Sequence, residues 1–415
     1  MKLKQIRVDG YKNLINCKVD LSDFNVLVGP NNSGKTNFLE AIQMLFPIAW
    51  GSGKLRKSVF KGLTPRFIGS SVCHLAAHKN KPLTLGVSFE TTFQRKRWVA
   101  EYTVMVQCED TNEHRSKFDV GFGAEMLAAK PVSQRGPVTK YIERSVETPE
   151  RFTVSAASGK KLERKIGKTK SAIEAIETIF PEHEGLPKVI PKLTIDLIDI
   201  GMSKVFAVSP DGLRNTIGEE KEKDELRVAS FDLLLAIDEL YKKKKLYSLF
   251  REAMCDILNL DNVDFEASYT KKGRKRVRSL AIKTQGSDYA DVAEYSDGTL
   301  AVAAILAALF SKKRDGPMLF VEELENCLHP EALERLVRFL QNHAHKWPVL
   351  ITTHSPYLLN CVNNPEDVNV ALVDGTGAAH FKKVRNTKQL RDYLKSGFMS
   401  FGDMLALNFE EVLGE

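Results

Sequence analysis

Residues 24–36 read Phe-Asn-Val-Leu-Val-Gly-Pro-Asn-Asn-Ser-Gly-Lys-Thr, and this stretch decides the fold. A short apolar run, Phe24–Val28, ends at a Gly-Pro pair, which is typical of a buried strand. The next eight residues fit the pattern G-x-x-x-x-G-K-[ST], and apolar residues then repeat at helical spacing from Phe38 to Leu45. The sequence therefore predicts a strand, a glycine-rich loop and a helix, in that order.

A loop of this kind holds phosphate groups. Its glycines let backbone N–H groups turn inward, and the start of the helix adds partial positive charge. The lysine of the pattern reaches the β- and γ-phosphates, and the hydroxyl that follows it ligates Mg²⁺. The alternative is a glycine-rich turn without a ligand, but the strand and helix around it favour phosphate binding. We therefore expect ATP and Mg²⁺, with nucleotide-binding residues Gly29, Pro30, Asn31, Asn32, Ser33, Gly34, Lys35 and Thr36.

Two carboxylates end a second apolar strand. The run Met318–Val321 is followed directly by Glu322 and Glu323. A carboxylate at a strand end can hold Mg²⁺, and its neighbour can polarise an attacking water molecule. The alternative is a charged strand-to-helix turn, which the phosphate loop in the same chain makes less favoured.

Two more polar segments adjoin apolar runs. Ser296-Asp297-Gly298-Thr299 precedes an apolar helical run, so it is either a helix cap or a second anion site with a hydroxyl, a glycine and a helix N-terminus. His354 follows the apolar run 349–352. A lone histidine is more often structural, but the carboxyl end of a strand in an α/β sheet is where such folds bind ligands.

The pattern along the chain indicates an α/β protein with three lobes. Helix and strand alternate from residue 296 to residue 374, which predicts a parallel sheet with crossover helices. Residues 83–110 read as an antiparallel hairpin, residues 219–260 as helical, and residues 111–170 as an accessory region of weak periodicity. We predict an N-terminal lobe at 1–110 with the phosphate loop and the hairpin, an inserted accessory and helical lobe at 111–285, and a C-terminal lobe at 286–415.

Composition narrows the class of protein. Apolar residues make up 43% of the chain, which predicts a large core, and no apolar run is long enough to cross a membrane. The six cysteines are scattered, which favours reduced thiols and a cytoplasmic location. A net charge of +7 permits contact with DNA without establishing it. The basic clusters at 95–97, 242–245 and 271–276 are, each by itself, more often solvated surface.

Together these motifs resemble the ABC-class ATPase heads of the SMC, RecF and overcoming-lysogenization-defect (OLD) proteins. Residues 296–299 resemble their shortened signature motif, residues 320–330 their Walker B motif and the loop after it, and residues 353–355 their switch-histidine loop. The resemblance covers about residues 1–50 and 290–375. It implies a P-loop NTPase head of ABC type, with a mixed sheet and flanking helices, an antiparallel β lobe and an inserted helical lobe.

The resemblance also implies a role for each residue. Glu322 would bind the metal together with Thr36, Glu323 would be the catalytic base, and His354 would sense the γ-phosphate. Ser296 and Gly298 would touch the γ-phosphate of ATP held by a second subunit. The chain would then form a head-to-head homodimer or a higher oligomer, with two ATP molecules between the heads.

Two departures refine the resemblance. SMC heads usually carry Asp where this chain has Glu322, whereas the Glu–Glu form is closer to the OLD group, and Leu324 replaces a usual proline. The extra methylene can slow hydrolysis. OLD proteins continue into a TOPRIM nuclease domain, for which we expect no room before Glu415. The chain thus resembles the stand-alone ATPases of bacterial antiphage systems such as Septu and PARIS.

Three functions remain open on the sequence. The first is a sensor ATPase of an antiphage defence system that controls a separately encoded effector, either a nuclease or a toxin. The second is a DNA-repair ATPase of the RecF type that binds DNA. The third is a scaffold that binds ATP and barely hydrolyses it. The first is favoured, because the chain resembles a head without an arm or an effector domain.

Overall fold

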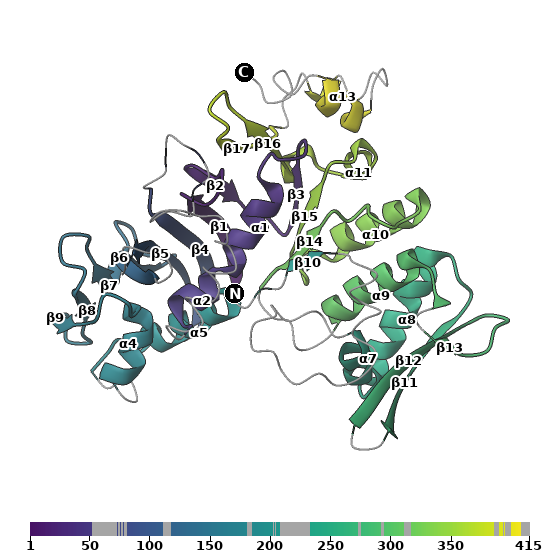
Figure 1. Cartoon of the computed structure of the whole chain (residues 1–415), viewed down its shortest axis with the longest axis horizontal. Coiled ribbons are helices and arrows are strands. Elements are labelled where there is room, and N and C mark those ends of the chain that lie inside the picture. The colour runs from purple at the N-terminus through teal and green to yellow at the C-terminus, as the bar shows by residue number, and fades with distance from the viewer. Residues whose placement is uncertain are drawn as a thin grey trace.

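The strand before the phosphate loop, β3 (Phe24–Val28), lies inside a six-stranded sheet (Figure 1). β3 is flanked by two parallel strands, and only the last strand of this sheet runs antiparallel to its neighbour. The order is β10 (Val205–Ala207), β14 (Leu319–Glu322), β15 (Val349–Thr353), β3, β16 (Val368–Val373) and β17 (Ala379–Lys383). The structure is a computed structural model that describes residues 1–51, 73, 75, 78, 81–110, 118–180, 185–201, 203, 205–207, 233–272, 275–291, 294–310, 317–385, 390–392, 394 and 400–407.

Both faces of this sheet are covered, as its apolar strands require. All five residues of β3 are buried: Leu27 belongs to the core with α1 (Lys35–Gln43) and α2 (Leu45–Ala49), while Val26 and Val28 belong to the core on the other face. That second core contains α9 (Asp297–Phe310) and α10 (Pro330–His343). The predicted alternation of helices and strands from residue 296 to residue 374 is therefore confirmed, and so is the predicted α/β fold class.

An eight-stranded antiparallel sheet packs against the far side of α1, at the left of Figure 1. The predicted hairpin at 83–110 is confirmed by the pairing of β4 with β5. Two helices lie against the same core, α4 (Ala172–Ile179) and α5 (Val189–Gly201). The strand order is β2 (Cys17–Asp20), β1 (Lys2–Asp9), β4 (Leu83–Phe93), β5 (Lys96–Asp110), β6 (Phe118–Pro131), β7 (Thr139–Arg144), β8 (Arg151–Ser155) and β9 (Lys161–Lys165).

The last four of these strands were not evident from the sequence. β6 pairs with β5 along its length, and β7, β8 and β9 follow in succession. The register shifts leave an extra residue at Gly123 in β6 and at Tyr141 in β7, and the buried residues of β6 do not follow the strict alternation that identifies a strand. The sheet thus continues past residue 110, where the sequence suggested a lobe boundary. The three lobes remain a prediction, with residues 118–165 on the N-terminal side.

A third sheet lies with helices at the right of Figure 1. The basic cluster at 271–276 spans the turn between the antiparallel strands β11 (Val263–Lys272) and β12 (Lys275–Thr284), and β13 (Ala290–Asp291) pairs with β12. The basic side chains of that turn lie outside the described residues. α7 (Leu233–Tyr241) and α8 (Lys244–Leu258) pack with α9 in one core.

Short elements complete the C-terminal part. These are α11 (Pro356–Asn360), the 3₁₀ helix η4 (Pro365–Asp367) and α13 (Phe401–Leu407), and the buried residues of α11 and α13 join the core of α9 and α10. Among the helices that the structure describes, none combines the length and the apolar character needed to cross a membrane.

Candidate nucleotide site

The phosphate loop connects β3 to α1 through a backbone that only small residues tolerate. Gly34 has φ +91°, and a Cβ at this position would lie 2.8 Å from the Cβ of Ala379. A Cβ at Gly29 would lie 2.5 Å from the carbonyl oxygen of Ala371. Ser33 and Lys35 are buried, whereas Pro30, Asn31, Asn32 and Thr36 are exposed. The loop therefore presents an open rim above a buried lysine.

Lys35 is the buried cation of the site. Its side chain is 6% exposed, and its Nζ donates to the carbonyl oxygens of Gly29 at 2.7 Å and Pro30 at 2.9 Å. Burial lowers the pKa of Lys35, while the charges of Glu323, Glu325 and Glu322 act in the opposite direction. In the described part of the chain no carboxylate forms an ion pair with Lys35. An anion at the rim would give this ammonium group an ion-pair partner of opposite charge.

Three strand ends meet beside this lysine. β15 lies between β14 and β3, all three are parallel, and Val28 pairs with Thr353 while Val321 pairs with Ile351. The residues that follow these strands consequently come together at one edge of the sheet. Sequence positions about 290 residues apart are brought into contact there, because the hydroxyl of Thr36 donates to Oε1 of Glu322.

The Thr36–Glu322 contact has the chemistry of a divalent-cation site. A hydroxyl and a carboxylate are hard oxygen donors of the kind that Mg²⁺ prefers, and Mg²⁺ commonly binds through one or two protein oxygens plus phosphate and water. No cluster of three or more His, Cys, Asp or Glu side chains suited to a metal occurs among the described residues. The Thr36 hydroxyl and the Glu322 carboxylate fit a Mg²⁺ ion whose remaining ligands are phosphate and water.

Glu323 adopts a strained backbone conformation. Its φ is +48°, in the left-handed region that side chains other than glycine seldom occupy. Its N–H donates to Oγ1 of Thr352 at 3.1 Å, and its Oε2 accepts from Nδ2 of Asn326 at 2.7 Å. These bonds hold the conformation and fix the direction of the carboxylate.

His354 follows β15 and faces the loop after β14. Its Nδ1 lies 3.8 Å from Oε1 of Glu323 and 3.4 Å from Oε1 of Glu325. Its side chain is 47% exposed, so the ring remains accessible. Lys35, Thr36, Glu322, Glu323 and His354, which the sequence singled out separately, thus lie at one edge of the sheet.

The other predicted anion-binding segment lies elsewhere. Ser296 caps α9, because its Oγ accepts from the N–H of Thr299 at 3.3 Å. Ser296 and Gly298 line a cavity of about 580 Å³ together with residues 257–260 and the loop after β14, including Cys327 and His329. A Cβ at Gly298 would lie 2.8 Å from the carbonyl oxygen of Cys327. The structure therefore brings this segment against the loop after β14, and no residue of the loop Gly29–Thr36 lines this cavity.

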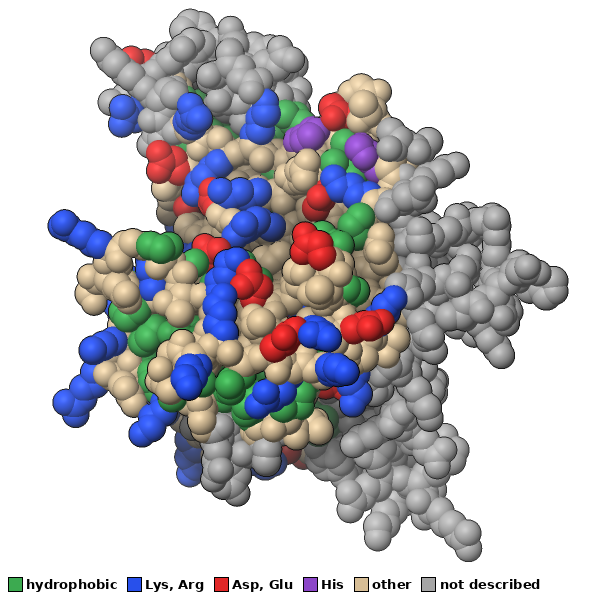
Figure 2. All heavy atoms as spheres, turned by 90° about the vertical axis from the view of Figure 1, so that its left-hand side faces the viewer, with side chains coloured by type: hydrophobic (Ala, Val, Ile, Leu, Met, Phe, Trp, Pro, Cys, Tyr) green, Lys and Arg blue, Asp and Glu red, His purple; other side chains and the backbone are tan. Residues whose placement is uncertain are grey.

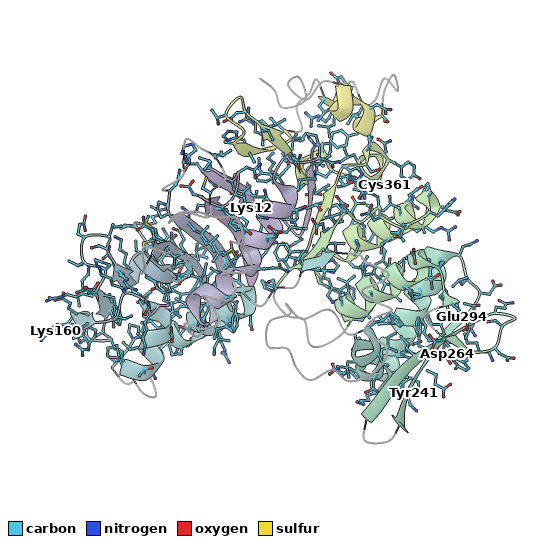
Figure 3. All side chains as sticks on the ribbon, viewed as in Figure 1. Lys12, Lys160, Tyr241, Asp264, Glu294 and Cys361 are labelled. Atoms are coloured by element: carbon cyan, nitrogen blue, oxygen red, sulfur yellow. The ribbon has the colours of Figure 1, made fainter. Side chains whose placement is uncertain are left out.

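Two residues of the site were missed by the sequence reasoning. Asn13 accepts from Nδ2 of Asn37 at 2.7 Å and donates to the carbonyl oxygen of Asn32 at 3.2 Å, so it ties the phosphate loop to α1; its neighbour Lys12 lies beside α1 (Figure 3). Glu325 was the other. Asn13 stands in the polar break after β1 and Glu325 two residues after Glu323, but neither position carries a periodic signal.

Comparisons with known proteins match this chain to one family and to several relatives. A family model described as AAA ATPase domain matches residues 1–359. The DNA replication and repair protein RecF of Vibrio campbellii is 40% identical over 79 residues, which is 19% of this chain and 20% of that protein. RecF of Vibrio cholerae is 39% identical over 79 residues, with the same coverage. The chain thus spans 20% of the length of the curated relatives it matches.

Solved structures that resemble the chain include SMC heads. The SMC head domain from Thermotoga maritima is 14% identical, with a TM-score of 0.41 over 93% of this chain and 100% of that one. The Smc head domain with an extended coiled coil bound to the C-terminal domain of ScpA, derived from Pyrococcus furiosus, is 12% identical, with a TM-score of 0.45 over 95% and 99% of the two chains.

Proposed function

The chain belongs to the AAA ATPase domain family, and we propose that it binds ATP in the loop Gly29–Thr36 and hydrolyses it at the edge of the six-stranded sheet. In this proposal the backbone N–H groups of the loop and the start of α1 surround the β- and γ-phosphates. Lys35 turns from the carbonyl oxygens of Gly29 and Pro30 to the phosphates. The support is its burial without an ion-pair partner in the described chain, since a phosphate would offset the cost of that burial.

Thr36 and Glu322 would hold Mg²⁺, which when bound would neutralise part of the charge of the phosphates. The hydroxyl of Thr36 would then release its hydrogen bond to Glu322 and turn an oxygen lone pair toward the cation. The longer side chain of Glu322, compared with the usual aspartate, supports slow hydrolysis.

Glu323 would accept a proton from the attacking water, and His354 would contact the γ-phosphate. The carboxylate of Glu323 is held by Asn326, and the strained backbone of Glu323 is of the kind that clusters at active sites. The single observation that carries the proposal is the meeting of Lys35, Glu323 and His354 at the ends of three adjacent strands.

Steady-state hydrolysis of ATP with Mg²⁺ tests the proposal directly. We expect turnover, with nucleotide affinity that depends on Lys35. A protein that binds ATP with Mg²⁺ but releases no phosphate would instead be the scaffold that the sequence left open. Omission of Mg²⁺ distinguishes nucleotide binding from hydrolysis, because binding of ATP should only weaken whereas hydrolysis should stop.

We further propose that ATP joins two chains head to head. Ser296 and Gly298 would touch the γ-phosphate held by the other subunit, and the same would hold in reverse, as two-fold symmetry requires. The support is the position of Ser296: it caps α9, is exposed and lines an open cavity away from its own phosphate loop. A homodimer or a higher oligomer follows.

The biological role that we propose is a sensor and regulatory subunit of a cytoplasmic antiphage defence system. It would control a separate effector, a nuclease or a toxin, through the ATP-dependent joining of heads. The Glu322–Glu323 pair supports this subtype, since it resembles the OLD group more than SMC heads. Co-purification with the products of neighbouring genes tests it, together with phage plaque counts for cells that carry wild-type or Lys35→Ala protein.

A RecF-like role in DNA repair is the second candidate, and one surface favours it. Exposed basic side chains gather at the outer end of the eight-stranded sheet, where Lys160 lies farthest out (Figures 2 and 3). Lys161 pairs with Glu143 at 3.5 Å and Arg151 with Glu163 at 3.1 Å, but in the described chain Lys160 and Lys165 have no carboxylate partner. Such side chains suit the phosphate backbone of DNA.

DNA binding as a function of salt concentration tests this candidate. We expect the double variant Lys160→Glu/Lys165→Glu to weaken binding of duplex DNA, and the slope of affinity against salt to fall by about one for each lysine that contacts a phosphate. The matched control is Lys244→Glu/Lys245→Glu, which alters two exposed lysines at the start of α8. Equal losses in both variants would indicate nonspecific attraction and reject this surface as a site.

A further inference from the structure

Glu325 lies in the turn between β14 and α10, two residues after the proposed base. The turn is fixed: Leu324 is fully buried in the core, and the N–H of Asn326 donates to the carbonyl oxygen of Glu323 at 2.9 Å. The side chain of Glu325 is 11% exposed. A nearly buried carboxylate is costly unless it has partners, so its contacts indicate what it is for.

Two donors of the segment Thr353–His354 bind one oxygen of Glu325, and the ring of His354 lies near the same oxygen. Oε1 accepts from Oγ1 of Thr353 at 2.8 Å and from the backbone N–H of His354 at 3.0 Å. Nδ1 of the His354 ring lies 3.4 Å from the same oxygen and farther, 3.8 Å, from Oε1 of Glu323. Glu325 therefore contacts both the backbone and the ring of His354, and it is the nearer of the two carboxylates.

The other oxygen of Glu325 is unused. Oε2 is buried and has no hydrogen-bond partner among the described residues. A carboxylate that served only to hold the turn would be expected to satisfy both oxygens, because an unpaired buried acceptor destabilises the fold. The charge of Glu325 also acts on Lys35, which places it in the electrostatic surroundings of the phosphate loop.

We propose that Glu325 is a positioning residue that directs Nδ1 of His354 toward itself, so that Nε2 is presented to the γ-phosphate. The proposal rests on the proposed role of His354. The two ring nitrogens lie on opposite sides of the imidazole, and a carboxylate at Nδ1 sets the orientation of the ring and the position of its proton. With a phosphate at Nε2, both nitrogens donate, and the carboxylate offsets the charge of the ring.

A double-mutant cycle tests whether Glu325 acts through His354. We expect Glu325→Ala to lower kcat for ATP hydrolysis by about 10- to 100-fold with KM nearly unchanged. In the His354→Ala background the same change should have no further effect, because the ring that it orients is gone. Full additivity of the two losses, or a rise in KM that accounts for the loss, would overturn the proposal.

Glu325→Gln guards against a folding defect. The amide oxygen can still accept from Thr353 and from the N–H of His354, so this variant should fold and melt like the wild type, while its loss of charge lowers kcat by a smaller factor than Glu325→Ala does. Glu334→Gln, on the exposed face of α10, is the matched control and should leave kcat unchanged. A Glu325→Gln variant with wild-type kcat would contradict a role for the charge.

A spectroscopic measurement separates this inference from the proposed function. The ¹⁵N resonance of Nδ1 of His354 in the nucleotide-free protein should be that of a protonated nitrogen, and Glu325→Ala should shift it toward the tautomeric average. An unchanged resonance would overturn the positioning role. If His354→Ala hydrolyses ATP normally, the proposed role of His354 fails, whereas the resonance still decides whether Glu325 orients the ring.

Discussion

Two regions of this molecule, each of which we propose to contact phosphate, are built in opposite ways. At the carboxyl edge of the six-stranded sheet, one chain brings together a buried lysine, two strand-end carboxylates and a histidine. At the start of α9, the same chain supplies only a hydroxyl, a glycine and a helix N-terminus around an open cavity. The first region holds the groups that the proposed hydrolysis uses, whereas the second holds only groups that we propose to contact a phosphate.

The difference separates the contacts that one chain makes by folding from the contacts that, in our proposal, need a second chain. Parallel strand pairing fixes the first region, because the register of β14, β15 and β3 places the carboxyl ends of the three strands side by side. No such pairing brings Ser296 to the phosphate loop. If the second region contributes to an ATP site, it contributes to the site of another chain. The ATP molecule would then contact both subunits. Each prediction below alters one region and asks whether the other responds.

The largest effect is expected from Lys35→Ala. Loss of the ammonium group should lower kcat/KM by about 100-fold or more. In thermal unfolding, ATP should raise the Tm of the wild type and leave that of the variant unchanged. Without ATP the variant should be no less stable, because the lowered pKa of Lys35 reflects the cost of burying its charge. Lys18→Ala, exposed on β2, is the control; equal ATP stabilisation of both variants would refute the site.

Glu323→Gln should separate binding from hydrolysis. We expect kcat to fall by about 10²- to 10⁴-fold, since the amide cannot accept the proton of the attacking water, while the affinity for ATP persists. ATP that is bound but not hydrolysed should then keep the two heads joined. Light scattering should report a dimer that lasts longer than the wild-type dimer. Glu334→Gln, on the exposed face of α10 and outside the cavity that Ser296 lines, provides the comparison. Turnover at the wild-type rate would exclude Glu323 as the base.

A mixing experiment asks whether the two regions meet in different chains. Ser296→Asp keeps a side chain that can cap α9 but places a negative charge where the partner's γ-phosphate would lie. Alone, it and Lys35→Ala should both be inactive. Mixed in equal amounts they should recover about a quarter of wild-type activity, because half of the dimers are mixed and each has one intact site. Mixed dimers without activity would show that Ser296 does not serve the partner.

The sequence located the first region because local signals mark it. Gly29–Thr36 follow an apolar run and open a helix, and Glu322 and His354 each follow an apolar run, so their positions at strand ends could be predicted without distances. Their convergence followed from the parallel alternation of strands and helices. Topology thus defined which residues lie near one another, and the structure adds the contact of Thr36 with Glu322.

Other features depend on contacts that no local pattern encodes. Glu325 binds Thr353 and His354 across 28 and 29 positions, from a turn without periodicity. The strands at 118–165 contain two register shifts, with an extra residue at Gly123 in β6 and at Tyr141 in β7, and the buried residues of β6 do not alternate regularly. Ser296 was readable both as a cap and as an anion ligand, and the structure confirms the cap. Only a second chain can test the anion role.

The smallest effect separates those two roles of Ser296. Ser296→Ala removes the acceptor for the N–H of Thr299 at the start of α9, and loss of such a cap costs about 1 kcal/mol in the free energy of unfolding. Ser296→Asp should cost less than that, because aspartate also caps helices and its charge suits the helix N-terminus. Denaturant unfolding without nucleotide measures both. For hydrolysis the order should reverse, with Ser296→Asp the more damaging, since an added charge repels a phosphate and a lost hydroxyl does not. The same order in both measurements would mean that Ser296 acts only as a cap, and the second region would then have no part in binding ATP.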